Sequence, residues 1–332
     1  MDNRQSAVDV LKGLAIVGVV LHHVKNRRFD ADVQEHLLGV IHVVAWAVYA
    51  FMFGSGYLHA LSRRAEAAGG FIWRRAQRLL VPYLWLGVLY AVVFQVIQNL
   101  GLVDYDPTRI EPNLLGKVKS LLLCDQEHVI GEQLYFFVLL FGISSAFVLL
   151  LAISTSTWFV AWLVGVLAVV LAGLMTVNPL PLATTGLSVE MLVGALLQYA
   201  LGFLLGRTRE ALPRWHRVAV GGVVVAAALA AINGPAGYSV AMLWVPLTLF
   251  LILNRLVAGS PWFGPWAALG QASGSIYAFH TPFILQPLLI ILFKLKVPQY
   301  ANVAISVLVT LVLCVAIHKM LNRYSWLRWF RI

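Results

Sequence analysis

The sequence is poor in charged residues and in cysteine. Only 11% of its 332 residues are charged, whereas 61% are hydrophobic, and the mean hydropathy is +0.84. So few charges cannot cover the surface of a water-soluble protein of this length. The two cysteines, Cys124 and Cys314, lie far apart, which excludes a disulfide scaffold, and the 26 glycines and 13 prolines exclude a collagen-like chain. The composition predicts a polytopic membrane protein.

About ten apolar runs are separated by polar breaks, and each approaches the roughly 20 residues that a helix needs to cross about 30 Å of hydrocarbon. They lie near residues 8–24, 38–61, 79–98, 134–153, 157–176, 189–206, 217–233, 238–256, 274–293 and 301–319. The runs lack the alternating pattern of a membrane barrel. We therefore predict an all-α bundle of about ten transmembrane helices that forms one domain over residues 1–332.

The basic residues predict how the bundle is oriented. The formal net charge is +10, but the arginines lie in short loops between apolar runs, which favours a role in orientation over nucleic-acid binding. A cytoplasmic N-terminus places most Lys and Arg inside, and both termini are then cytoplasmic. Residues 99–133, outside, form a long connection that we expect to bind or cover something. Residues 257–273, inside, are typical of an interfacial or re-entrant piece.

The first apolar run carries several ionisable residues, each of which costs about 2.5–3.5 kcal/mol at mid-membrane. Lys12 and His23 are eleven positions apart, so both project from the same helical face. Asp9 lies one turn before Lys12 and can neutralise it. Imidazole titrates near neutral pH, so His23 can serve as a general base. We predict catalytic roles for His23, Lys12 and Asp9, although a lysine that reaches the inner headgroups and a histidine that caps the helix would also fit.

A strongly basic segment joins the second and third runs. A helix through this segment would gather Arg74, Arg75 and Arg78, and guanidinium groups bind phosphate bidentately. The positive-inside rule or contact with anionic lipid explains the cluster equally well. Just before it, Ser55 lies between two glycines, which permit an unwound turn or the close approach of another backbone.

Further polar residues stand near the ends of later runs. Tyr277 and His280 are three positions apart and share a face, and Pro282 frees a backbone carbonyl one turn earlier. A histidine in this position also fits a packing role between helices. The nine histidines are scattered without the spacing of a metal site, so we predict no metal.

Three residues are expected near the outer face. Glu132 and Gln133 stand where the long outer loop re-enters the membrane, and His42 is predicted at about the depth of His23 on the next helix. Glu132 and Gln133 also fit as interfacial caps, and His42 as a packing residue.

Several of these motifs coincide in one order. The order is Arg4, Asp9-x-Leu11-Lys12-Gly13-Leu14-Ala15 with His23 eleven residues after Lys12, Phe53-x-Ser55-Gly56-Tyr57-Leu58, Arg75-x-x-Arg78-Leu79-x-x-Pro82-Tyr83, Glu132-Gln133-x-Tyr135, Leu269-Gly270 and Tyr277-x-x-His280-x-Pro282. Over nearly the whole chain, this arrangement resembles the acyltransferase-3 family of integral membrane acyltransferases.

The resemblance implies that an acyl group, most often acetyl, moves from cytoplasmic acyl-coenzyme A to a hydroxyl of a sugar or glycan at the outer side of a bacterial inner membrane. His23 matches the essential histidine of the family, Lys12 matches the Arg or Lys ahead of it, and Arg75 and Arg78 match its paired arginines. The implied partners are a glycan or lipid-linked sugar acceptor and membrane lipids, with acyl-CoA as co-substrate.

These patterns give a predicted site. The donor-binding residues are Arg74, Arg75, Arg78, Ser55, Tyr277 and His280, and the acceptor-binding residues are Glu132, Gln133 and His42. A secondary transporter is the main alternative, but the ionisable residues are concentrated in the first run and in the loop between the second and third runs rather than in matching halves. A transmembrane acyl carrier that supplies a separate transferase is the other.

Overall fold

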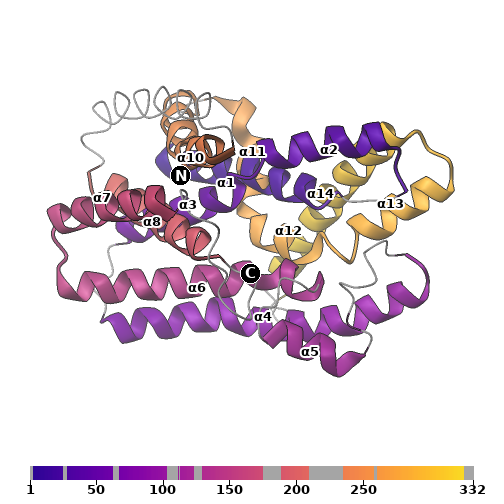
Figure 1. The fold of residues 1–332 in the computed structure, drawn as a ribbon, viewed down its shortest axis with the longest axis horizontal. Coiled ribbons are helices and arrows are strands. Elements are labelled where there is room, and N and C mark those ends of the chain that lie inside the picture. The colour runs from indigo at the N-terminus through magenta and orange to yellow at the C-terminus, as the bar shows by residue number, and fades with distance from the viewer. Residues whose placement is uncertain are drawn as a thin grey trace.

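The computed structural model describes residues 3–24, 28–62, 67–102, 111, 113–122, 129–174, 188–208, 235–257 and 260–324. Within these residues the chain is helical (Figure 1). The helices are α1 Asn3–His22, α2 Ala31–Val43, α3 Ala47–Leu61, α4 Ala68–Asn99, α5 Leu114–Leu122, α6 Val129–Ile153, α7 Thr157–Leu174, α8 Val189–Arg207, α10 Pro235–Leu256, η3 Pro261–Phe263, α11 Gly264–Gln271, α12 Ser273–Phe279, α13 Leu285–Lys294 and α14 Gln299–Arg323.

Five helical segments are long and apolar enough to cross a membrane. They are Ala68–Asn99, Leu134–Ile153, Thr157–Leu174, Val189–Arg207 and Gln299–Arg323. They confirm five of the predicted runs as candidate spans. The predicted run 217–233 lies outside the described residues. The all-helical, multi-pass architecture is therefore confirmed, whereas the number of ten spans and the side of each terminus stay predictions.

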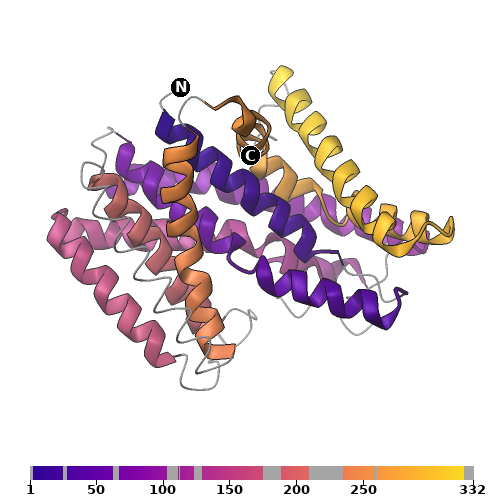
Figure 2. The same ribbon diagram turned by 90° about the horizontal axis from the view of Figure 1, so that it is seen from above.

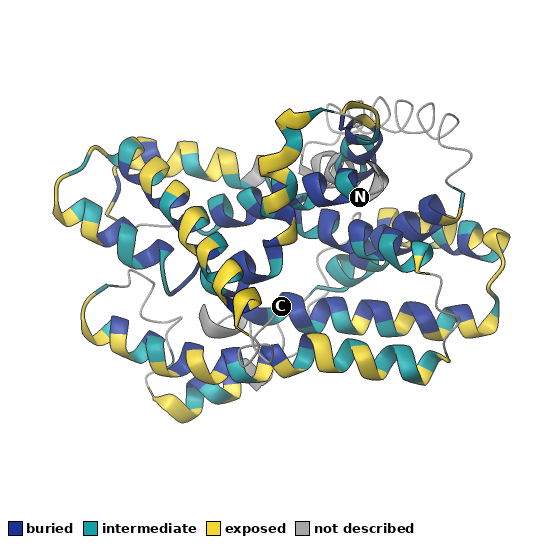
Figure 3. Ribbon diagram, turned by 180° about the vertical axis from the view of Figure 1, so that it is seen from behind, coloured by how far each residue is buried: buried dark blue, intermediate teal, exposed yellow. Residues whose placement is uncertain are grey.

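Apolar side chains on the periphery face outward, as expected of surfaces in lipid. On α4, four residues spaced four apart form an exposed stripe: Leu84, Val88, Val92 and Val96 are each half or more exposed. Large apolar side chains are also exposed along α7 and α14, and Figure 3 colours exposed residues yellow. A water-soluble protein would bury such stripes against another element. The exposed faces therefore support the assignment of a multi-pass membrane protein.

The structure divides the predicted run 38–61 into two helices. α2 ends at Val43, residues 44–46 form a turn, and α3 begins at Ala47. This turn packs over Gly18 of α1, where an added Cβ would lie 3.2 Å from the Cβ of Val44 and 3.4 Å from that of Ala47. The missing side chain of Gly18 gives the bend room to approach α1.

The predicted run 274–293 is also interrupted. α12 ends at Phe279, a turn occupies residues 280–284, and α13 begins at Leu285. The connection predicted to be interfacial or re-entrant, residues 257–273, contains the short helices η3 and α11, and α11 packs against α1. The first half of α1 and the end of α14 both lie beside the junction of α11 and α12, since Asp9 contacts Gln271 and His318 contacts Ser275.

Glycines bring two pairs of helices into backbone contact. A Cβ on Gly56 of α3 would lie 2.0 Å from the carbonyl oxygen of Tyr199 on α8, and one on Gly202 of α8 would lie 2.0 Å from that of Phe53. Gly13 of α1 meets α11 in the same way, at the carbonyl of Trp266. α3 is continuous through its two glycines, so they serve close helix packing rather than an unwound turn.

The long connection 99–133 contains α5, which packs on α4 and α6. The Lys117 ammonium on α5 is fully buried and donates a hydrogen bond of 2.6 Å to Oε1 of Gln95 on α4. Burial lowers the pKa of Lys117, and the nearby Glu111 carboxylate opposes this effect. Within this connection, α5 therefore covers part of α4.

Candidate functional site

Two histidines that are distant in sequence meet inside the bundle. His23 directly follows α1, and His280 directly follows α12. Nε2 of His280 lies 3.3 Å from Nδ1 of His23, and their ring centroids are 4.9 Å apart at an interplanar angle of 73°. His280 is fully buried and His23 is partly exposed. We call these two residues the histidine pair.

The hydrogen bonds of the pair assign its tautomers. Nδ1 of His280 lies 2.9 Å from the carbonyl oxygen of Tyr277 and 3.0 Å from that of Ile276. A carbonyl only accepts, so this nitrogen donates and Nε2 of the neutral ring is an acceptor. Nδ1 of His23 lies 2.8 Å from the carbonyl oxygen of Val19 and therefore also donates. In neutral His23 the lone pair is then on Nε2, which is the nitrogen able to take a proton.

Local chain geometry holds His280 in place. Pro282 has no N–H to bond the carbonyl of Ala278, and the hydroxyl of Tyr90 donates to this carbonyl at 3.1 Å and also to Thr281. The predicted freed carbonyl is therefore present and is bonded by a side chain of α4. Nε2 of Gln286, on α13, donates to the backbone carbonyl of His23 at 3.1 Å. The pair is thus fixed from α4, α12 and α13.

Lys12 and Asp9 form an ion pair on α1. Nζ of Lys12 lies 3.8 Å from Oδ1 of Asp9, and Nε2 of Gln271 donates to Oδ2 of Asp9 at 3.3 Å. The structure thus brings Asp9 and Lys12 together as expected. Eleven residues at 1.5 Å each place Lys12 about 16 Å from His23 along the helix. The ion pair and the histidine pair are separate, and a catalytic role for Lys12 and Asp9 stays a prediction.

Arginines of α4 approach the Lys12 end of α1. Arg78 is close enough to both Lys12 and Arg75 for their like charges to interact. The guanidinium of Arg75 lies over the ring of Phe71, 5.4 Å from its centroid, and interacts with the hydroxyl of Tyr199. Arg74 is exposed on the same helix.

Sequence reasoning missed an aromatic group beside these arginines. His59 of α3 stacks on Phe71 at a centroid distance of 4.5 Å, and its Nδ1 lies 3.0 Å from the hydroxyl of Tyr199. Arg207, at the end of α8, lies over Phe203 and is near His59. We call Lys12, Arg75, Arg78 and Arg207 the basic cluster. The sequence signal that could have indicated His59 is its spacing from Ser55, because residues one helical turn apart lie on the same face of a helix.

The other predicted donor-binding residues lie in different places. His280 belongs to the histidine pair and not to the basic cluster. Tyr277 is buried, with its ring packed against Phe136, Phe137 and His280. Ser55 is partly exposed on α3, within the helix that carries His59. A role for Ser55 and Tyr277 in binding the donor stays a prediction.

The predicted acceptor-binding residues are only partly placed. Glu132 and Gln133 are in the first turns of α6, and His42 is near the end of α2. Their side chains lie outside the described residues. Among the described side chains, no three His, Cys, Asp or Glu residues are grouped so that they could hold a metal ion.

The fold and the site define a class, a multi-pass helical membrane protein with a histidine pair and a separate basic cluster. A family model described as an acyltransferase domain matches residues 5–319, nearly the whole chain. The chain therefore belongs to the acyltransferase-3 family, as its motifs predicted. Family membership indicates a membrane acyltransferase. No curated protein and no solved structure matches the chain.

Proposed function

We propose that the protein transfers an acyl group, most simply acetyl, from cytoplasmic acyl-CoA to a hydroxyl of a sugar or cell-envelope glycan at the outer side of a bacterial inner membrane. Family membership supports acyl transfer. The donor, the acceptor and the sidedness are the proposed parts. They rest on the different chemistry at the two ends of α1 and on the positive-inside pattern of the loops.

The histidine pair is the observation that carries the proposal. Transfer to a hydroxyl requires a base for the hydroxyl proton. Nε2 of His23 takes that proton as the acceptor oxygen attacks the thioester carbonyl carbon. The carbon–sulfur bond then breaks, and the proton passes from His23 to the leaving thiolate, so that an ester and a free thiol are the products. His280 is a positioning residue, because it accepts from Nδ1 of His23 and fixes the orientation of the ring.

The basic cluster is suited to hold the donor. Coenzyme A carries several phosphates at one end of a long flexible arm and the thioester at the other. Guanidinium groups bind phosphate with paired hydrogen bonds, and Arg75, Arg78 and Arg207 provide three of them near the start of α4 and the end of α8. The arm then has to cover the distance of about 16 Å along α1 between Lys12 and His23. No metal is part of this proposal.

The first test compares two neighbouring histidines. Proteoliposomes containing purified protein receive radiolabelled acetyl-CoA and an extract of bacterial envelope glycans. Since a general base contributes about 10²–10⁴-fold, His23→Ala should lower label transfer to glycan by at least a hundredfold. His22→Ala is the matched control and should keep most of the activity, because the hydrogen bond of the histidine pair joins His23 and His280, whereas the ring of His22 lies at a centroid distance of 5.4 Å from that of His23. Near-normal transfer by folded His23→Ala would contradict the proposal.

The same assay separates the alternatives. Label on glycan supports a transferase. Uptake of a solute without transfer of label would indicate a transporter. Transfer of label only after a second protein is added would indicate an acyl carrier. Either of the last two outcomes would overturn the proposed reaction.

A further inference from the structure

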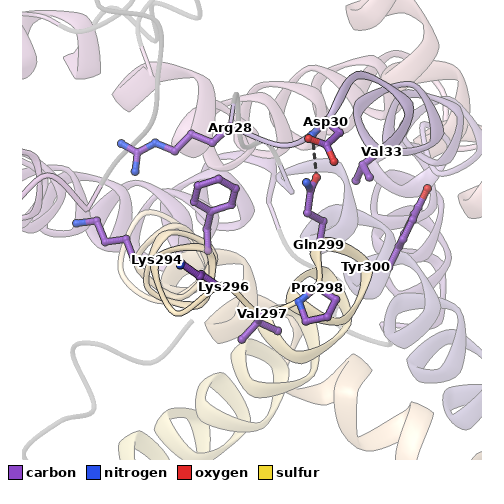
Figure 4. A pocket seen from close by; sticks show the side chains of 10 residues that line it. Arg28, Asp30, Val33, Lys294, Lys296, Val297, Pro298, Gln299 and Tyr300 are labelled. Carbon is purple, nitrogen blue, oxygen red and sulfur yellow. Dashed lines mark hydrogen bonds between the residues drawn. The ribbon is translucent and has the colours of Figure 1, made fainter.

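A pocket of about 710 Å³ is lined by residues that belong neither to the histidine pair nor to the basic cluster (Figure 4). It is formed between the segment that follows α1 and the connection from α13 to α14. In the ribbon, α2, α13 and α14 come together at this end of the molecule (Figure 2). The lining residues are Arg28, Asp30, Val33, Phe293, Lys294, Lys296, Val297, Pro298, Gln299 and Tyr300.

The charge of the lining is mainly positive. The lining has three cationic side chains, Arg28, Lys294 and Lys296, and one carboxylate, Asp30, and all four residues are exposed. In Figure 4, Arg28 and Lys294 extend toward the same side of the pocket, and Asp30 lies with Gln299 on the other side. Charges in these numbers do not lie in hydrocarbon, so the pocket is outside the lipid core. One side of it is therefore suited to an anionic group.

The opposite side of the pocket is held by hydrogen bonds. The backbone N–H of Asp30 donates to Oε1 of Gln299 at 2.8 Å. The hydroxyl of Tyr300 lies 2.6 Å from Nδ1 of His36 on α2, which fixes an exposed aromatic ring at the rim. A carboxylate and an amide can bind neighbouring hydroxyl groups, and an aromatic face accommodates the C–H face of a sugar ring. These features suit a sugar that carries the anionic group.

α13 connects this pocket to the histidine pair. Gln286, at its beginning, donates to the backbone of His23, whereas Lys294, at its end, lines the pocket. Their separation of eight positions corresponds to about 12 Å. Oε1 of Gln286 is buried and has no hydrogen-bond partner among the described residues. Because Nε2 of Gln286 donates to the carbonyl of His23, Oε1 is the acceptor of this amide and can accept a hydrogen bond from a hydroxyl near His23.

We propose that this pocket binds the acceptor through a phosphate or carboxylate group on a sugar, and that the acceptor extends along α13 so that a hydroxyl reaches Gln286 and His23. The acceptor is then an acidic glycan or a sugar phosphate, not a neutral sugar. This assignment rests on the proposed acyl transfer, but the binding that it predicts needs no donor.

Binding is measured on the purified full-length chain in nanodiscs of phosphatidylcholine at low salt, with glucose 1-phosphate as probe and glucose for comparison. Glucose 1-phosphate should bind more tightly than glucose. The double variant Arg28→Gln, Lys294→Gln should weaken its binding about tenfold, as expected for the loss of two exposed charge contacts. Lys119→Gln removes an exposed lysine that does not line the pocket and is the matched control.

Equal affinity for the two probes, or equal affinity of the double variant and the control, would overturn the proposal. A lipid headgroup is the other source of a phosphate. Nanodiscs that contain phosphatidylglycerol separate the two sources, because competition with glucose 1-phosphate would assign the pocket to lipid and contradict a role in acceptor binding. Missing acetyl transfer with intact glucose 1-phosphate binding would contradict only the proposed reaction. Intact transfer without such binding would contradict only this assignment.

Discussion

The two ends of α1 differ in the side chains they gather and in how these are held. At the His23 end, backbone carbonyls bond the two imidazole rings, and Gln286 bonds the backbone of His23. At the Lys12 end, an ion pair and several guanidinium groups surround aromatic rings. Fixed rings with assigned tautomers suit the transfer of a proton, whereas an excess of cations suits the retention of an anion. The comparison predicts that changes at the two ends affect different kinetic constants.

The largest effect in this comparison should come from His280. His280→Leu removes one of the two acceptors for Nδ1 of His23 and leaves the carbonyl oxygen of Val19 as the other, so the ring is held less firmly and kcat should fall about a hundredfold while KM changes little. His280→Gln keeps an oxygen that can accept the same bond and should recover most of this loss. Steady-state kinetics with acetyl-CoA measure both constants. Equal kcat values for the Leu and Gln variants, at equal melting temperature, would mean that His280 serves only packing.

Changes in the basic cluster should have a smaller effect, and they should alter KM rather than kcat. The double variant Arg75→Gln, Arg78→Gln should raise KM for acetyl-CoA about tenfold and leave kcat near its normal value, because it removes binding that is the same in the ground and transition states. Arg255→Gln, at the exposed end of α10, is the control. If KM does not change, these arginines contact lipid headgroups and the donor is held elsewhere.

The smallest effect on turnover should come from the helix contact that supports the basic cluster. Gly202→Ala places a Cβ against the carbonyl oxygen of Phe53, and such overpacking costs about 1–3 kcal/mol. Gly142→Ala is the matched control on α6, where no atom lies within 4 Å of the added Cβ. Thermal unfolding in detergent should show a lower melting temperature only for Gly202→Ala, with kcat of the folded fraction nearly unchanged. Equal melting temperatures would show that α3 and α8 can move apart.

Hydropathy predicted the helices but not all of their ends. The runs 134–153 and 301–319 appear as single helices and contain no proline to interrupt the helical hydrogen bonds. The turn at residues 44–46 has no glycine or proline to mark it. The turn depends instead on the space above Gly18 of α1. The hydropathy of residues 38–61 does not include Gly18 and therefore could not predict the turn. The interruption after α12, by contrast, is marked by Pro282.

Single residues of the site could be predicted from the sequence, but which of them lie together in space could not. His23, His280 and the paired arginines were all recognised from their motifs. The contact between His23 and His280 joins residues 257 positions apart, and periodicity within one helix carries no information on such a distance. For the same reason His280 was expected beside the donor, and Tyr199 and Arg207 were not expected at the basic cluster. Tyr199 lies within an apolar run, where its hydroxyl has no visible signature in sequence.

The length of α4 determines where its arginines lie. Its 32 residues span about 48 Å, whereas the hydrocarbon layer is about 30 Å thick. Even at a tilt of 40°, near the upper end of what is observed, the helix would still cover about 37 Å of depth. With the exposed stripe Leu84–Val96 set in the lipid, at least one turn at the arginine end extends past the acyl chains into water. A water-soluble nucleotide thioester can thus meet Arg75 and Arg78 without first leaving its own hydration layer.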